Sequence, residues 1–261
     1  MARLSSPALR ACALALALLG AIAIAPACAS ELSVAQMVQF LALASADQPA
    51  NFDGKDLSDL DLSRLDFRHA SLRGANLFAS RLVASNFSGT DLGAANLNGA
   101  WLMGADFTNA RLAGASLLSV VILGGPVKAM PIFKGADLHG AKMIADLPGA
   151  DLAGADLREA RIGVDIRNQG MGQMRTDLTG AHLSGADLNR SLLSFADLRR
   201  SNLRGANLFR VKLVGADLTG ADVTGADFTE ADLSDAVLLD VTGLSQATGL
   251  ARADKLDQPG R

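Results

Sequence analysis

Two long stretches of the chain carry a bulky apolar residue at every fifth position. The first stretch runs from Leu57 to Ile122, and the second runs from Leu178 to Leu238. An α-helix turns by about 100° per residue, so side chains five residues apart would scatter around it, and on a strand they would alternate between the two faces. The period is satisfied if the chain bends once per five residues and returns each apolar side chain to a shared axis. The spacing therefore predicts a solenoid.

Each unit also has a fixed internal order. A small residue stands two positions before the apolar centre, Asp or Asn stands directly before it, and Gly often closes the unit, which suits a tight turn with positive φ. The segment from Gly215 to Leu233 reads GADLTGADVTGADFTEADL. This pattern resembles the pentapeptide-repeat family over most of the chain, from about Phe52 to Val241.

The resemblance implies an all-β fold, a right-handed quadrilateral β-helix. In that family four pentapeptides form one square turn, with the small and large residues inside and the other three outside. Roughly 33 centres then give about eight coils, and at about 4.8 Å per coil the rod is about 40 Å long. The two ends of such a rod need caps, because exposed strand edges recruit other chains.

The chain divides into six segments on this basis. Residues 30–50 are expected to form an N-terminal capping helix, with apolar residues at helical spacing from Val34 and with Ser33 as the N-cap. Repeat blocks occupy 51–122 and 178–242. Between them, residues 123–177 hold interrupted repeats with two loops, at 123–136 and 163–176. Residues 243–261 form a tail that is expected to cap the last coil.

The first 29 residues are typical of a secretory signal peptide. Arg3 and Arg10 precede an apolar run from Ala11 to Ala25, which is too short to span a membrane, and Ala27 and Ala29 form an A-x-A cleavage site. We expect cleavage before Ser30, a periplasmic or secreted product, and no transmembrane segment after cleavage. The alternative is a lipoprotein acylated at Cys28, although the residues before Cys28 match such a site poorly.

Cleavage before Ser30 would remove both cysteines and two arginines. The mature chain then has no disulfide or thiol chemistry. It keeps 22 Lys and Arg against 27 Asp and Glu, a net charge of −5. This mildly acidic balance argues against nucleic-acid binding through a globally basic surface.

Residues twenty apart should lie above one another, which places surface side chains in columns. One column contains Val83, Met103 and Leu123, and a second contains Trp101 and Val121. We call these five residues the apolar stripe. Such a stripe indicates an interface or a surface that another part of the chain covers. The loop around Pro126 is the favoured cover, since it supplies Val127, Met130, Ile132 and Phe133.

Basic residues gather early in the second block, and acidic residues follow them. The arginine belt comprises Arg190, Arg199, Arg200, Arg204 and Arg210, together with Lys212. A belt of this kind is suited to an anionic partner. Interspersed surface charge also keeps a repeat rod soluble, and we favour this role for the arginines over the binding of a partner.

The sequence gives no sign of an enzyme or of a cofactor. The histidines His69, His139 and His182 lack the short spacings of a zinc site. There is no G-x-S-x-G elbow and no phosphate-binding G-x-x-x-x-G-K-[ST] motif. Met171 and Met174 form M-x-x-M, a pattern that can bind Cu(I), but loop packing by flexible Met explains it more simply.

Three functions remain open at this point. The leading hypothesis is a non-catalytic exported scaffold that binds an envelope protein, with end-to-end homodimers possible. The second is a DNA mimic that binds a topoisomerase such as gyrase, as the resemblance to quinolone-resistance members of the family implies. Against it stand the signal peptide and the modest net charge. The third is periplasmic copper binding through the loop methionines.

Overall fold

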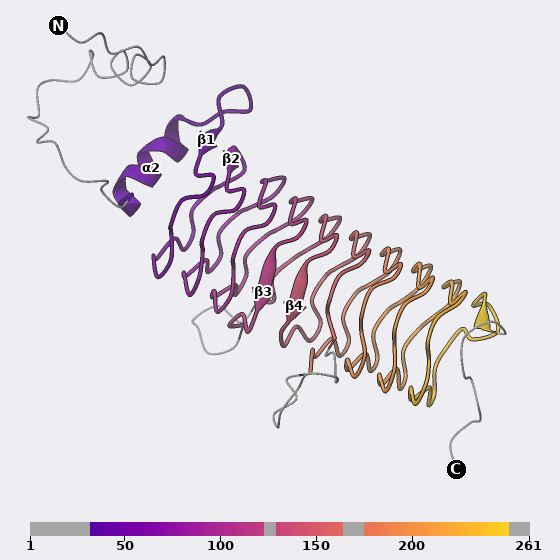
Figure 1. Cartoon of the computed structure of the whole chain (residues 1–261). Coiled ribbons are helices and arrows are strands. Elements are labelled where there is room, and N and C mark those ends of the chain that lie inside the picture. Colours follow the sequence, from indigo (N-terminus) through magenta and orange to yellow (C-terminus); the bar gives the residue numbers. More distant parts are fainter. Residues whose placement is uncertain (1–31, 123–128, 164–174, 251–261) are drawn as a thin grey trace, which may run out of the picture. The chain divides into compact units, whose positions relative to one another are not determined.

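The computed structural model describes residues 32–250, except 123–128 and 164–174. The compact unit of the described chain begins at Leu32. One helix, α2 (Val34–Leu43), precedes a stack of coils (Figure 1). The named strands are β1 (Ala50–Asn51), β2 (Ala70–Ser71), β3 (Ser116–Leu118) and β4 (Lys142–Ile144).

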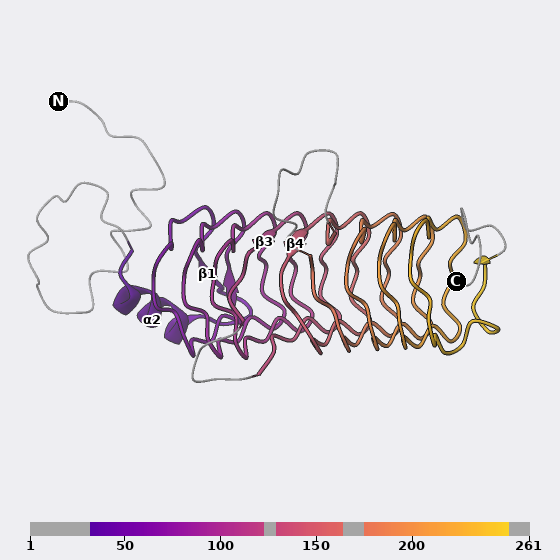
Figure 2. The same cartoon turned by 90° about the horizontal axis from the view of Figure 1, so that it is seen from below.

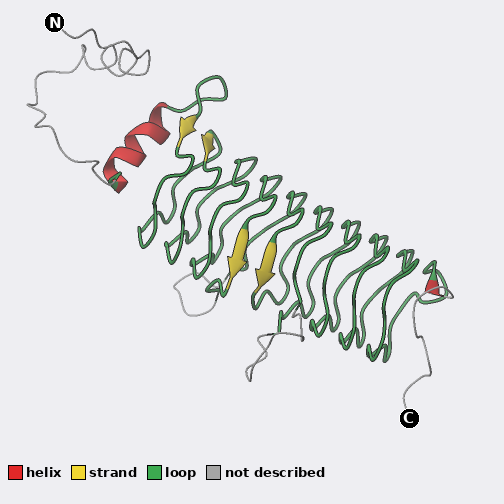
Figure 3. Ribbon diagram, in the orientation of Figure 1, coloured by secondary structure: helices red, strands yellow, loops and turns green. Residues whose placement is uncertain are grey.

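The strands are short because the chain turns at every fifth residue. β1 pairs in parallel with β2, and β3 pairs in parallel with β4. Elsewhere in the described residues, neighbouring coils are joined by single parallel bridges. Figure 3 accordingly draws most of the stack as turns and loops, although the coils are hydrogen-bonded throughout. The fold is a β-helix.

Each corner is a tight turn of the same kind. The amide of Ala75 donates to the carbonyl oxygen of Leu72 over 3.1 Å, and Gly74 between them has φ +61°. A positive φ at this place is the mark of a type II turn and favours Gly. Several corners nevertheless carry other residues, such as Ala79 with φ +54°. The expected role of Gly in the repeat is confirmed, but the fold tolerates substitutes.

The bulky centres fill the axis of the coil. Leu57, Leu62, Phe67 and Leu72 make one complete turn, and all four are fully buried. The small residues, such as Ala75, are buried beside them. Phenylalanines stack on each other through four successive coils, with ring centroids 4.6–5.0 Å apart and planes within 5° of parallel: Phe67, Phe87, Phe107 and Phe133.

Four bridge ladders divide the surface of the rod into four faces. We number the faces by their centres in the first turn: face 1 begins at Leu57, face 2 at Leu62, face 3 at Phe67 and face 4 at Leu72. On face 1, parallel bridges connect nine residues of successive coils, and each of them directly precedes a centre: Asp56, Asn76, Asn96, Ser116, Lys142, Arg161, Leu192, Lys212 and Asp232. Figure 2 shows the regular stacking from a second direction.

The coils remain continuous through both interruptions. Asp106 pairs with Ile132, an offset of 26 instead of 20, so six residues are inserted. Asp137 then pairs with Asp156, an offset of 19, and Asp146 pairs with Asp177, an offset of 31. The second insertion therefore adds eleven residues. The segments 123–128 and 164–174, which lie outside the described residues, have these same lengths.

The expected first loop was too long. We placed residues 123–136 in it, but Ile132 pairs with Asp106 and Phe133 occupies the axis with no exposed surface. The expected second loop, 163–176, also ends within the coil, since Thr176 is buried and its hydroxyl donates to carbonyl oxygens of the core, including that of Met143. The error arises because each insertion shifts the register of the repeat.

Helix α2 covers the first coil. Ser33 is its N-cap, as expected, and forms a capping box with Gln36. Met37 is fully buried, and Val34 and Leu41 pack against the core. The helix ends at Leu43 and is therefore shorter than the expected segment 30–50. No helix in the described part of the chain is long and apolar enough to cross a membrane.

Candidate interaction surfaces

The aspartates that recur before each centre have a structural role. Asp227 accepts the amide of Thr229 over 2.9 Å, and the hydroxyl of Thr229 donates to the same carboxylate oxygen over 2.6 Å. The same Asx turn recurs along the rod. Asn serves equally well, and Asn76 also donates to Asp56 of the coil before it over 2.8 Å. These carboxylates therefore stabilise the turns and do not mark a catalytic pair.

The apolar stripe is partly covered, which agrees with the favoured interpretation. Val83 and Met103 are buried, with 4% and 0% of their surface exposed, so they are not available to a partner. Trp101 and Val121 lie half-buried on face 2, and the Arg81 guanidinium lies 5.4 Å from the centre of the Trp101 ring. The loop around Pro126 was expected to cover the apolar stripe with Phe133 among its residues. This part of the prediction is wrong, because Phe133 lies in the core.

Two residues of that hypothesis lie outside the described residues, namely Leu123 of the stripe and Val127 of the loop. Met130, by contrast, is partly buried against the core. Among the described residues of the apolar stripe, Trp101 and Val121 are therefore the two that a partner can contact.

The arginine belt is spread around the rod. Arg199 and Arg200 follow the centre on face 2, Arg204 follows the centre on face 3, and Arg190 and Arg210 occupy turns that follow face 4. These arginines do not share one face, so they do not form a single docking surface.

Three arginines of the belt are also held by nearby carboxylates. Arg204 pairs with Asp222 at 3.1 Å, and Arg210 pairs with Glu230 at 2.5 Å. Arg199 binds Asp197 at 2.6 Å and lies 3.9 Å from Asp217. The belt is therefore largely neutralised by acidic residues of its own and the next coil. This arrangement agrees with the interpretation of interspersed charge as a solubility feature.

The pair of Arg199 and Asp197 belongs to an acidic ladder that the sequence analysis missed. On face 2, four aspartates stack in successive coils: Asp146, Asp177, Asp197 and Asp217. The hydrogen bonds from Arg199 lower the pKa of the Asp197 carboxyl, against the opposing effect of partial burial. A pocket of about 260 Å³ opens beside this pair, and Arg175 and Phe195 help to line it.

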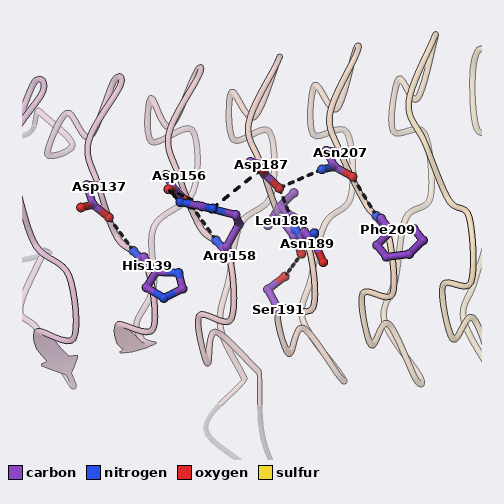
Figure 4. Close-up of polar contacts among 10 residues, drawn as sticks. All are labelled: Asp137, His139, Asp156, Arg158, Asp187, Leu188, Asn189, Ser191, Asn207 and Phe209. Atoms are coloured by element: carbon purple, nitrogen blue, oxygen red, sulfur yellow. Dashed lines mark hydrogen bonds and ion pairs between the residues drawn. The ribbon is translucent and has the colours of Figure 1, made fainter.

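Face 4 carries a second ladder of the same type (Figure 4). Asp137, Asp156 and Asp187 stack in successive coils, and Asn207 follows and donates to Asp187 over 3.0 Å. The guanidinium of Arg158 donates hydrogen bonds from Nε and Nη2 to the Asp156 carboxylate over 2.5–3.0 Å, and its Nε lies 4.0 Å from the Asp187 carboxylate. These hydrogen bonds lower the pKa of the Asp156 carboxyl and raise the pKa of the Arg158 guanidinium.

Neither ladder looks like a metal centre. Within residues 32–250, apart from the two gaps, no group of three or more His, Cys, Asp or Glu side chains is arranged to hold a metal ion. Met171 and Met174, the candidate copper ligands, lie outside the described residues. The candidate cleavage site at Ala27 and Ala29 and the candidate lipidation site at Cys28 also lie outside them.

The comparisons with known proteins agree with the β-helix. A family model described as pentapeptide repeats matches eight copies, at residues 50–77, 80–117, 174–208 and 212–241. The chain belongs to the pentapeptide-repeat family. Proteins of this family are generally non-enzymatic structural or interaction proteins. A search of the curated proteins finds no match.

Several solved structures of pentapeptide-repeat proteins resemble the chain. HetL, involved in heterocyst differentiation regulation in the cyanobacterium Nostoc, is 30% identical; the match covers 82% of this chain and 95% of HetL, with a TM-score of 0.30. A thylakoid-lumen protein of Arabidopsis thaliana is 29% identical over 49% of this chain and 76% of its own, with a TM-score of 0.28. QnrB1, a plasmid-mediated fluoroquinolone resistance protein, is 17% identical over 79% of this chain and 87% of its own, with a TM-score of 0.31.

Proposed function

We propose that this protein is a non-catalytic, exported scaffold that mediates protein–protein interaction in the cell envelope, built on a right-handed coil. The observation that carries the proposal is the filled axis: the apolar centres of the repeat blocks are buried, so recognition falls to the outward columns of the four faces. Long ladders of side chains at a fixed spacing suit contact with another protein better than they suit a small substrate.

Export is the second part of the proposal, and it is supported by the N-terminal sequence. Two arginines, an apolar run of 15 residues and an A-x-A site precede the unit that begins at Leu32. We propose cleavage before Ser30 and a periplasmic or secreted product. Lipidation of Cys28 is the alternative, and it would leave the same rod tethered to a membrane.

The exposed remainder of the apolar stripe can be tested directly. Trp101→Asp combined with Val121→Asp places two charges on face 2 without altering a fully buried side chain, whereas Met103→Asp would disturb the core. A matched control carries Phe78→Asp and Ile132→Asp, since both side chains are exposed on other faces. We expect the face 2 variant to lose a co-purifying envelope protein and the control to retain it. Retention by both variants would remove face 2 as the interface.

The DNA-mimic function is the second candidate, and the acidic ladder on face 2 favours it. Four stacked aspartates in successive coils provide a row of negative charge along the rod. Against this candidate stand Arg199, which neutralises part of the ladder, and the proposed export. Gyrase supercoiling in a large excess of the mature protein tests it: inhibition would support the mimic, and unchanged supercoiling would exclude it.

Two further parts of the proposal concern assembly and metal. Leu238 and Val241, which pack against the core in the last turns, are only partly buried there, which supports end-to-end pairing of two rods. Sedimentation of the mature protein would distinguish a monomer from such a homodimer.

Copper binding through Met171 and Met174 is the third candidate function, and failure to retain Cu(I) against a modest chelator would exclude it.

A further inference from the structure

Most arginines of the rod are held by a carboxylate, but a group of cations on face 1 is not. Ion pairs hold Arg68, Arg73, Arg81, Arg111, Arg158, Arg199, Arg204 and Arg210. Lys142, Arg161 and Lys212 are exposed, and none of them makes an ion pair within the described part of the chain. No carboxylate of the described residues therefore neutralises these three side chains.

The three cations belong to one column of face 1. The bridges run from Lys142 to Arg161, then to Leu192 and then to Lys212, so they occupy four successive coils. At about 4.8 Å per coil, Lys142 and Lys212 lie about 14 Å apart. Arg190 is exposed in the turn that leads into Leu192, so this coil carries a cation as well. We call Lys142, Arg161, Arg190 and Lys212 the basic strip.

An apolar column lies beside the basic strip. On face 1 the residues that follow the centres in these coils are Leu118, Ile144, Gly163, Ser194 and Val214; Leu118, Ile144 and Val214 are partly exposed, whereas Gly163 and Ser194 are buried. Leu118 of β3 and Ile144 of β4 are direct partners on neighbouring coils, and these two strands lie side by side in Figure 1. Residues two apart on a strand are about 6.6 Å apart, so the two columns are parallel and close. Face 1 is thus basic along one edge, and its other edge is aliphatic at Leu118 and Ile144 and again at Val214.

Acidic residues limit this positive surface on the side of face 2. Asp146 and Asp177 line face 2 on one side of it, whereas Asp156 and Asp187 on face 4 are paired with Arg158. Glu159 and Arg190 occupy the same corner between faces 4 and 1 in successive coils, so this corner carries both charges. An anionic ligand that extended beyond face 1 onto face 2 would approach the carboxylates of that face, which make no ion pair with face 1 within the described residues, and like charges would repel it. A ligand no wider than one face avoids them.

We propose that the basic strip and its aliphatic column bind an acidic amphipathic helix of a partner protein; this inference rests on the proposed scaffold function. A helix rises about 5.4 Å per turn, close to the spacing of about 4.8 Å between coils. Carboxylates one turn apart would therefore meet successive cations of the strip when the helix lies along the rod. Apolar side chains next to them on the helix would pack on Leu118, Ile144 and Val214.

The test uses the mature protein and a synthetic peptide. The peptide is a helix with glutamates one turn apart and leucines beside them, and its binding is followed by fluorescence anisotropy. The test variant carries Lys142→Glu, Arg161→Glu and Lys212→Glu. The control carries Lys55→Glu, Arg64→Glu and Lys134→Glu, which change the net charge equally at exposed positions away from the strip. Thermal unfolding confirms that both variants fold.

We expect the strip variant to bind the peptide about tenfold more weakly than the natural protein, and the control variant to bind within about twofold of it. Binding should also weaken as salt rises, because the contact is between charges. An equal loss in both variants, absence of peptide binding, or tighter binding to phosphatidylglycerol vesicles than to the peptide would overturn the proposal.

A cross-linking experiment separates this inference from the scaffold function itself. A photo-reactive amino acid is placed at Leu192 in the basic face or at Trp101 on face 2, and the protein is produced in cells. A protein cross-linked from position 192 and from no face 2 position supports the strip. A protein cross-linked from position 101 but not from 192 overturns the strip and leaves the scaffold intact. No cross-linked protein from either position contradicts both.

Discussion

At the scale of single residues, the repeat is explained by the hydrogen bonds of its turns. The Asp or Asn before each centre accepts the amide two residues later, and a Ser or Thr at that place donates to the same oxygen, as in Asp217 and Thr219. The consensus was evident in the sequence, but its cause was not, because a row of aspartates also suggests a charged surface. The structure shows that turn geometry comes first and surface charge follows from it.

The corner glycines offer a prediction about stability. Gly54 and Gly215 have nearly the same φ, +62° and +63°, but a Cβ at Gly54 would meet nothing within 4 Å, whereas one at Gly215 would lie 2.6 Å from the Phe195 ring. Gly54→Ala should lower the free energy of unfolding by about 1–2 kcal/mol, the cost of a left-handed alanine. Gly215→Ala should cost about 1 kcal/mol more, because it also overpacks the ring. Equal losses in urea unfolding would show that the ring is not fixed.

The Arg199–Asp197 pair predicts a pH dependence. Its hydrogen bonds lower the pKa of Asp197 in the folded state, so the pair stabilises the fold above the unfolded pKa of about 3.9, and this contribution is lost as the pH falls through the folded pKa. Asp197→Asn keeps the acceptor of the turn but removes the charge. The variant should be less stable by no more than about 1 kcal/mol at pH 7, since the pair is partly exposed. The difference should vanish in unfolding measurements at low pH; a difference that persists there would contradict the assignment.

At the scale of elements, the helix and the insertions show where the sequence was sufficient. The spacing of Val34, Met37 and Leu41 predicted an amphipathic cap, and the helix packs these three side chains on the first coil. The positions of the two insertions were predicted correctly, but the predicted loops were longer than the inserted segments. Phe133 follows the break by an irregular interval, so its position in the axis is recognised only when the bridge from Asp106 to Ile132 fixes the register.

The capping role of α2 predicts contrasting effects of two neighbouring substitutions. Met37 is fully buried against the first coil, whereas Val38 exposes 44% of its surface. Met37→Asp should detach the helix and leave the edge of the first coil open, so the protein should aggregate. Val38→Asp should remain monodisperse with nearly unchanged stability. Light scattering during heating measures both, and similar behaviour of the two variants would show that α2 is not the cap.

At the scale of the whole molecule, the period gave the β-helix but only part of its surface. Residues twenty apart were placed correctly within a block, as for Arg81 and Trp101. The columns that cross the insertions were missed, because Lys142, Arg161 and Leu192 are separated by 19 and 31 residues. Val83 and Met103 occupy outward positions of the repeat and yet are enclosed, which agrees with the expected covering of the apolar stripe.

The central claim is that this rod works as an exported scaffold, and one measurement tests it most directly. Cells producing the full-length chain are fractionated, and the mass of the product is determined. We expect a periplasmic or secreted product that begins at Ser30. An uncleaved product in the cytoplasm would contradict it, and would direct attention to the acidic ladder on face 2 and to gyrase.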